Sequence, residues 1–223
     1  MKYISVGIDG PAGAGKSSVS KAVAKGLEFV YIDTGAMYRA TALFAIKSGI
    51  DIKNEREKLI SRLDELDIVI RYTDEGQRIF LDGEDVSETI RTPEVSLGAS
   101  NVAVIPEVRE KLVSMQQKMA EHDNVLMDGR DICTVVLPNA DVKIFLTASV
   151  EERAKRRYKE MLKKGAECDL EEIKRDIEYR DKNDSERAAS PLRQAEDAVL
   201  VDTTGYTFDE VVDRITAMIK EKM

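Results

Sequence analysis

Short apolar runs alternate with stretches of helical periodicity along most of the chain. Five runs of four or five mostly apolar residues are expected to be buried strands, at residues 4–8, 29–32, 124–127, 142–146 and 198–201. Segments with a helical spacing of apolar residues follow these runs. Strands that alternate with helices in this way favour an α/β fold, with a parallel five-stranded sheet and helices on both faces.

The pattern changes between about residues 51 and 91. An amphipathic helix is expected at 55–66, followed by alternating apolar positions at 68–72 and 79–81 with a turn at 74–77 between them. This alternation predicts an antiparallel hairpin, which does not belong to a succession of parallel strands and helices. We therefore expect a small inserted subdomain with an antiparallel sheet. The alternative is a flat edge that pairs with itself.

A glycine-rich segment, here called the phosphate loop (residues 10–17), joins the first predicted strand to the first predicted helix. It fits the pattern G-x-x-x-x-G-K-[ST], whose backbone N–H groups and helix N-terminus bind phosphate. Lys16 is expected to bridge the outer phosphates, and the Ser17 hydroxyl to bind Mg²⁺. The alternative is a glycine-rich turn beside a chance Lys-Ser pair, but the flanking strand and helix favour a phosphate site. Its expected lining is Gly10, Pro11, Ala12, Gly13, Ala14, Gly15, Lys16, Ser17 and Ser18.

Composition narrows the range of partners. With 223 residues and a net charge of -8, the chain is long enough for one domain with an insertion and too acidic for a general nucleic-acid binder. Cys133 and Cys168 lack metal-ligand spacing, which fits a reducing cytoplasm. The sequence shows no signal segment and no apolar stretch near the roughly 20 residues that cross a bilayer. We expect a cytoplasmic monomer without a membrane partner.

Several arginines fall at predicted helix starts or strand ends, on the edge of the sheet where the phosphate loop also lies. They are Arg39, Arg109, Arg130, Arg180 and Arg187. Guanidinium groups match phosphate oxygens in pairs, so this placement predicts a second anion beside a bound triphosphate. The alternative is a set of surface ion pairs, each of little energetic value.

Six segments together closely resemble bacterial cytidylate kinases, and the resemblance runs essentially from end to end. They are residues 9–17 (DGPAGAGKS), 33–39 (DTGAMYR), 83–87 (GEDVS), 90–92 (IRT), 128–131 (DGRD) and 180–188 (RDKNDSERA). The resemblance implies a P-loop kinase that transfers the γ-phosphoryl group of ATP to CMP or dCMP with Mg²⁺. It also implies a core domain at 1–40 and 92–223, an insertion at 41–91 that binds the monophosphate, and a short helical lid at 151–168.

The resemblance also assigns residues to roles. The acceptor phosphate is expected to contact Thr34, Arg39, Arg130 and Arg187; the cytosine, Ser100, Arg109 and Asp131; and the ribose, Arg180 and Asp184. Lys16 and Arg130 are expected to be catalytic, together with the lid arginines Arg153 and Arg157, although a solvated charged helix is the alternative for the lid. Asp33 and Asp128 are candidates for holding the water shell of Mg²⁺, with helix capping as the alternative.

One position departs from the family pattern. Cys133 stands where glycine is usual, and we consider two interpretations, a reactive thiol beside the base site and a small buried filler. Two other functions compete with a cytidylate kinase: a kinase for UMP or AMP, and a P-loop switch protein that binds a partner. The hairpin insertion and the set of Ser100, Arg109 and Asp131 argue against the first, and the lack of an Asn-Lys-x-Asp motif argues against a guanine-dependent form of the second.

Overall fold

A computed structural model describes residues 3–73, 76–163 and 165–223. The chain divides into two compact units, which are described separately. The larger unit comprises Met1–Tyr31 and Ala120–Met223, and the smaller unit comprises Ile32–Met119. In the described part of the chain, no helix combines the length and the apolar character that a membrane crossing requires.

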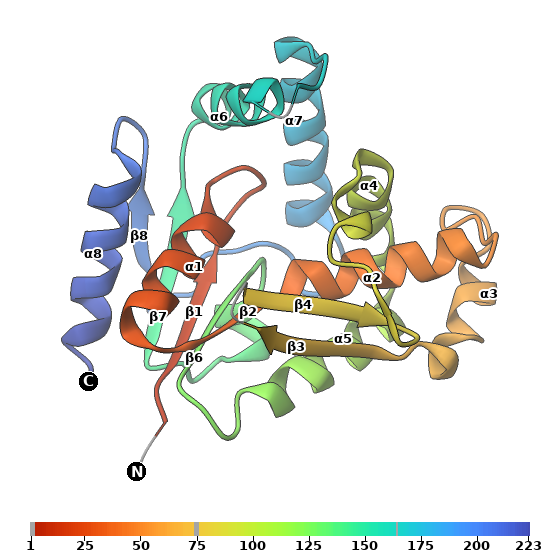
Figure 1. Cartoon of the computed structure of the whole chain (residues 1–223), viewed down its shortest axis with the longest axis horizontal. Coiled ribbons are helices and arrows are strands. Elements are labelled where there is room, and N and C mark those ends of the chain that lie inside the picture. Colours follow the sequence, from red (N-terminus) through yellow and green to blue (C-terminus); the bar gives the residue numbers. More distant parts are fainter. Residues whose placement is uncertain (1–2, 74–75, 164) are drawn as a thin grey trace. The chain divides into compact units, whose positions relative to one another are not determined.

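The larger unit is built on the predicted parallel sheet, which the structure confirms. The strands of this sheet are β1 (Ser5–Asp9), β2 (Val30–Asp33, of which only Val30 and Tyr31 belong to the larger unit), β6 (Val125–Gly129), β7 (Val142–Thr147) and β8 (Val199–Asp202), in the order β2-β6-β1-β7-β8 (Figure 1). The central strand β1 pairs in parallel with β6 and β7, so that Asp9 lies opposite Gly129 and Phe145. The segments after β1 and after β6 therefore leave the sheet side by side.

Two helices of the larger unit pack on this sheet through the faces that carry their regularly spaced apolar side chains. The helices of the larger unit are α1 (Lys16–Leu27), α6 (Val150–Lys163), α7 (Leu170–Glu186) and α8 (Phe208–Lys220), with a short π-helical turn, η3 (Ile132–Val136). Val6 and Ile8 of β1 pack with apolar side chains of α1 and α8. Gly7 points to the opposite face, where a Cβ would meet Ile132 and Cys133 of η3. Helices α6 and α7 share a separate apolar cluster of Ala154, Ile173 and Ile177.

The smaller unit holds the predicted antiparallel hairpin. It comprises α2 (Thr34–Lys47), α3 (Arg56–Ile60), η1 (Leu63–Glu65), β3 (Ile68–Thr73), β4 (Gly76–Leu81), β5 (Glu84–Asp85), η2 (Thr89–Arg91), α4 (Pro93–Val102) and α5 (Pro106–Met119). Strands β3 and β4 pair antiparallel with Ile70 opposite Ile79, and β5 adds a short third strand. The turn predicted at 74–77 includes Asp74 and Glu75, which lie outside the described residues. The single helix expected at 55–66 is instead α3 followed by the 3₁₀ turn η1.

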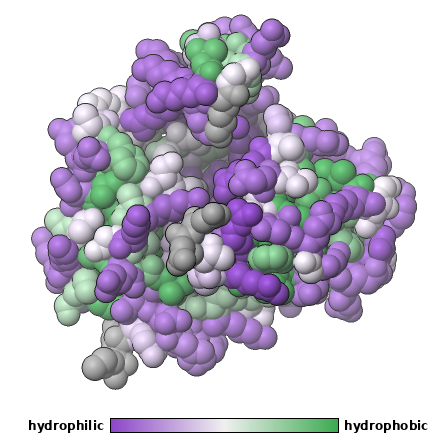
Figure 2. Space-filling model, viewed as in Figure 1, coloured by the Kyte–Doolittle hydropathy of each residue, from purple (hydrophilic) through white to green (hydrophobic). Residues whose placement is uncertain are grey.

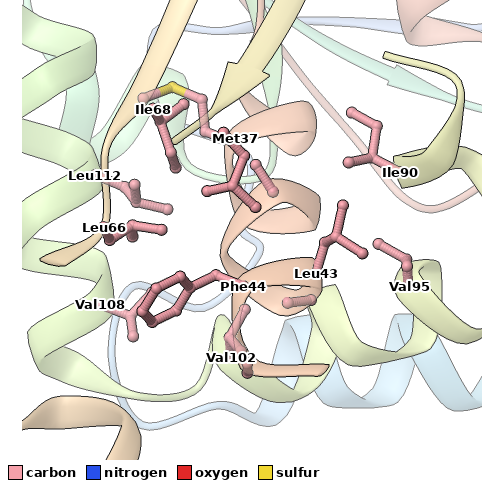
Figure 3. Close-up of a cluster of buried hydrophobic side chains, with 14 of the residues drawn as sticks. Met37, Leu43, Phe44, Leu66, Ile68, Ile90, Val95, Val102, Val108 and Leu112 are labelled. Carbon is pink, nitrogen blue, oxygen red and sulfur yellow. The ribbon is translucent and has the colours of Figure 1, made fainter. Parts of the chain in front are cut away.

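A continuous apolar core explains why the smaller unit extends beyond the insertion expected at 41–91. Met37, Leu43 and Phe44 of α2 pack with side chains from the hairpin, α4 and α5 (Figure 3). Helices α2 and α4 approach closely because Gly98 faces Ala42, and a Cβ on Gly98 would lie 3.0 Å from the Ala42 Cβ. The hairpin therefore shares one core with the helices on either side of it in the sequence.

Candidate active site

The phosphate loop has a backbone that only glycine can adopt at its first position. Gly10 follows β1 with a φ of 152°, and a Cβ there would lie 1.9 Å from the Leu146 carbonyl oxygen. Gly15, with a φ of 88°, lies directly before Lys16, where α1 begins. The predicted strand, loop and helix are thus present, and the N-terminus of α1 lies at the end of the phosphate loop.

Lys16 is buried within this loop. Its Nζ donates to the carbonyl oxygens of Gly10 at 2.7 Å and of Pro11 at 2.8 Å. Burial, together with the positive charge of Arg130, lowers the pKa of Lys16 to about 7, against the opposing effect of nearby carboxylates such as Asp128. Because an anion favours the ammonium form, a phosphate bound by the loop would restore the full charge of Lys16.

Ser17 and Asp128 place two kinds of oxygen ligand together next to the loop. The Ser17 hydroxyl donates to Asp128 Oδ2 at 2.7 Å, and the Tyr31 hydroxyl donates to Asp128 Oδ1 at 2.8 Å. Hydroxyl and carboxylate oxygens suit Mg²⁺, which typically keeps several waters and takes only one or two protein carboxylates. No group of three or more His, Cys, Asp or Glu that could hold a metal ion occurs among the described residues.

Asp33, the other predicted magnesium candidate, belongs to the smaller unit and caps α2. Its Oδ1 accepts from the Ala36 N–H at 2.9 Å, and its Oδ2 pairs with Arg39 at 2.9 Å. Gly35 makes room for this pair, because a Cβ there would lie 3.1 Å from Arg39 Nη1. The contacts of Asp33 are those of the capping alternative, and they orient Arg39, which lies five residues after Thr34, the first residue of α2.

Arg130 directly follows the last residue of β6 and forms an ion pair with Asp184 on α7. The distance from Arg130 Nε to Asp184 Oδ2 is 2.6 Å. Burial disfavours the charged form of both groups, but the attraction and the hydrogen bond between them outweigh this effect. The pKa of Arg130 is therefore raised, and the pKa of Asp184 is lowered. Arg180, one turn earlier on α7, also lowers the pKa of Asp184. Arg130, predicted to bind the acceptor phosphate, therefore lies together with the two predicted ribose residues and close enough to Lys16 to influence its charge.

Asp131 and Arg187 form another ion pair in the larger unit, and in this pair both side chains are buried. Arg187 Nη2 lies 3.5 Å from Asp131 Oδ1, and both side chains are less than a tenth exposed. Asp131 directly precedes η3, whose first two backbone N–H groups, those of Ile132 and Cys133, each donate to the Asp9 carboxylate at 2.8 Å. Asp9 was not expected at the site. A lone carboxylate at the end of a buried apolar strand, one residue before the phosphate loop, is the signal that could have identified it.

Ser100 and Arg109, predicted to read the base, are buried in the smaller unit. Ser100 lies on α4, and Arg109 on α5. The Arg109 guanidinium lies 5.7 Å from the centre of the Tyr38 ring, and its Nη1 donates to the Ala103 carbonyl at 3.4 Å. An aromatic face holds a planar guanidinium in a fixed orientation, which suits recognition of a planar base.

The arginines of α6 differ in their surroundings. Arg153 is buried and donates to the Ala12 carbonyl oxygen in the phosphate loop at 2.7 Å. Arg156 donates to Thr203, and Arg157 forms an exposed pair with Glu160 at 3.1 Å. Of these three arginines, Arg153 is the one for which the structure records a bond to the phosphate loop.

Cys133 has the environment of a buried filler. Its side chain is 2% exposed, and a Cβ on Gly7 would lie 2.8 Å from its Sγ. Burial raises the pKa of the Cys133 thiol, so the reactive thiolate form is disfavoured. The structure therefore supports the packing interpretation, in which Gly7 provides the space for the additional side chain.

Comparisons with known proteins agree with this geometry. The family model described as "Cytidylate kinase" matches residues 6–221. Similar curated proteins include a cytidylate kinase of Anoxybacillus flavithermus, 51% identical over 222 residues and covering 100% of this chain and 98% of the relative. Another, from Caldicellulosiruptor bescii, is 52% identical over 215 residues, or 96% of this chain and 95% of the relative.

Solved structures bear on the fold alone. A gluconokinase from Sinorhizobium meliloti superimposes with a TM-score of 0.51 at 15% identity, over 98% of this chain and 92% of that one. An uncharacterized protein from Eubacterium ventriosum gives a TM-score of 0.54 at 13% identity, over 99% of each chain.

The family is shown by the match of the family model over almost the whole length and by relatives that are about half identical to this chain. This chain belongs to the cytidylate kinase family.

Proposed function

We propose that this protein is an ATP:CMP phosphotransferase, which transfers the γ-phosphoryl group of ATP to CMP or dCMP and releases ADP with CDP or dCDP. The observation that carries the proposal is the grouping, within the larger unit, of the phosphate loop and Lys16 with the Arg130–Asp184 pair. A phosphate loop beside a partly buried arginine suits the transfer of a phosphoryl group between two phosphates.

Catalysis by alignment and charge neutralisation fits this set of residues. The attacking oxygen of a nucleoside monophosphate is already an anion, so the reaction needs no general base. Lys16 would neutralise charge on the ATP phosphates, and Arg130, Arg187, Thr34 and Arg39 would hold the acceptor phosphate. A helical lid at 151–168 would exclude water, which would otherwise hydrolyse ATP. Arg153 and Arg157 would lie in this lid.

We propose that Mg²⁺ binds at Ser17, with Asp128 and Asp33 as candidates for contacts to its waters. The Ser17 hydroxyl and the Asp128 carboxylate lie within 2.7 Å of each other and supply the hard oxygen ligands that this ion prefers. When bound, the ion would neutralise phosphate charge that backbone N–H groups cannot cancel alone.

Preference for cytosine would come from Asp131, Arg109 and Ser100. Cytosine presents acceptors at O2 and N3 and a donor at N4, so it requires both a cationic donor and a carboxylate or hydroxyl acceptor. Uracil carries a carbonyl where cytosine has the amino group and would oppose Asp131 with a second acceptor.

Arg180 and Asp184 would hold the ribose. We also propose that the enzyme acts as a monomer.

A coupled ADP-release assay with ATP, Mg²⁺ and one monophosphate at a time tests the proposal. We expect CMP and dCMP to give kcat/KM values far above those for UMP, AMP and GMP. Equal or faster turnover of UMP or AMP would make the protein a kinase of another specificity. ATP hydrolysis at the same rate without any acceptor would instead indicate a nucleotide switch. The Lys16→Ala variant is the control, because it should fold and yet lose kcat by orders of magnitude.

A further inference from the structure

Two consecutive peptide groups of the phosphate loop are held from outside the loop, at Ala12. The Ala12 N–H donates to Asp181 Oδ1 of α7 at 3.1 Å, and the Ala12 carbonyl accepts from Arg153 Nη1 of α6 at 2.7 Å. Arg153 and Asp181 also pair with each other, with Nη1 2.7 Å from Asp181 Oδ2. Ala12, Asp181 and Arg153 thus form a closed ring of three contacts.

The other contacts of Arg153 fix it in this ring. Its Nε donates to the Ala148 carbonyl at 3.0 Å, and its side chain is 5% exposed. The neighbouring loop residue, Gly13, has a φ of 74°, and a Cβ there would lie 3.4 Å from the Arg153 Cβ. The Arg153 guanidinium therefore binds the loop backbone and the Asp181 carboxylate, and these contacts stabilise the conformation of the loop.

Helix α7 connects this ring to the acceptor arginine. Asp181 lies one turn before Asp184 on the same helix, and residues three apart face the same side. Asp181 holds Ala12 of the phosphate loop, while Asp184 holds Arg130 at 2.6 Å. One helix therefore orients both the loop expected to bind ATP and a side chain expected to bind the acceptor phosphate.

We propose that Asp181 is a positioning residue that sets the phosphate-loop geometry through Ala12 and through Arg153. This inference rests on the proposed function, because it assigns the loop to ATP. Loss of the carboxylate would leave the Ala12 N–H without its acceptor and the buried Arg153 charge without its partner, so the loop would leave its binding geometry. The effect should fall on ATP and spare CMP.

The test compares Asp181→Ala and Asp181→Asn with a matched control, Asp176→Ala. Asp176 is an exposed aspartate on the same helix. Native-state amide exchange of Ala12, followed by NMR without any substrate, should accelerate about tenfold or more in Asp181→Ala and remain unchanged in Asp176→Ala. Asp181→Asn, which keeps an oxygen acceptor for the Ala12 N–H, should show a smaller acceleration. A thermal unfolding midpoint close to wild type confirms that the exchange reports local opening.

Kinetics provides the second readout. In Asp181→Ala the KM for ATP, and the dissociation constant of a non-hydrolysable ATP analogue, should rise about tenfold or more, while the KM for CMP changes less than about twofold. Combining Asp181→Ala with Arg153→Met should cost little more than the worse single variant. Unchanged Ala12 exchange, or equal losses for ATP and CMP, would overturn the inference. Accelerated Ala12 exchange in a protein that fails to phosphorylate CMP would instead contradict the proposed function alone.

Discussion

At the scale of single residues, Asp131 is the side chain to which we assign most of the proposed preference for cytosine. This carboxylate is 5% exposed, and its neighbour Arg187 lies 3.5 Å away. In so buried a position, an unpaired acceptor costs about 1 to 3 kcal/mol, because it cannot recover the hydrogen bonds of water. A uracil carbonyl opposite Asp131 should carry a penalty of this size, which cytosine avoids by donating from its amino group.

We therefore expect Asp131→Ala to narrow the preference for CMP over UMP. The ratio of the two kcat/KM values should fall about 5- to 150-fold, which is the rate equivalent of the lost discrimination. Both substrates are measured on the same variant, so a general loss of activity cancels from the ratio. A ratio equal to that of the wild-type protein would remove Asp131 from base recognition.

Asp9 predicts a dependence of stability on pH. Burial raises the pKa of Asp9 to about 6, even though two backbone N–H groups favour its charged form. The folded pKa thus lies above the ordinary value of 3.8. The contribution of Asp9 to stability is therefore fully present below pH 3.8 and is lost as the pH rises through about 6.

Denaturant unfolding between pH 4 and 7 measures this loss. The free energy of unfolding of the wild type, relative to the non-titrating Asp9→Asn variant, should fall by up to about 3 kcal/mol over this interval. Asn also replaces one acceptor by a donor opposite an N–H group, which shifts the whole difference but not its slope with pH. A difference that stays constant between pH 4 and 7 would contradict the raised pKa.

At the scale of elements, the residue that ends α1 has a strained backbone conformation that a substitution could relieve. Glu28 closes the helix in the left-handed conformation, with a φ of 57°, and the following Phe29 N–H bonds to the Ala24 carbonyl at 2.9 Å. Glycine adopts this conformation without the clash of a Cβ, which makes it the usual residue at such helix ends. Glu28 therefore costs stability at an exposed position.

Glu28→Gly should raise the free energy of unfolding by about 0.5 to 1 kcal/mol, as measured by denaturant unfolding. Glu28→Ala is the matched control, because alanine removes the same charge but keeps the Cβ. It should give no comparable gain. If both variants stabilise the protein equally, the effect comes from the carboxylate and not from the backbone.

The elements that could be predicted from the sequence are those that local patterns determine. The five strands and the hairpin follow from residues close in the chain, and the structure contains all of them. The short strand β5 and the 3₁₀ turn η1 were missed, because two or three residues carry too little periodicity to be recognised.

The predicted site differs from the structure where contacts are distant in the sequence. Asp181 meets Ala12 across 169 positions, and Asp9 meets Ile132 across 123. No local pattern encodes such pairs, so the sequence indicated Arg153 through its place in a charged helix and missed its carboxylate partner. Cys133 is similar: its space comes from Gly7 on the neighbouring strand, and only the fold brings the two together.

At the scale of the whole molecule, an acidic protein must bind two anions. The net charge is -8, and hydrophilic side chains cover most of the face shown in Figure 2. The long-range field of the protein therefore does not favour nucleotides, and affinity has to come from local groups such as the buried Lys16 and the partly buried Arg130. Buried charges are screened little by salt, so binding should depend on side-chain geometry more than on ionic strength.

The residues that the family resemblance assigns to CMP are divided between the two compact units, whereas the phosphate loop belongs to the larger unit alone. A ligand slows amide exchange in the parts whose opening would release it. At about 100 times its dissociation constant, CMP should stabilise its contacts by about 2.7 kcal/mol and slow exchange about a hundredfold, in α2 of the smaller unit as well as in α7 of the larger. A non-hydrolysable ATP analogue alone should protect the larger unit only. Hydrogen exchange followed by mass spectrometry distinguishes these patterns, and protection of a single unit by CMP would mean that half of the assigned contacts are not made.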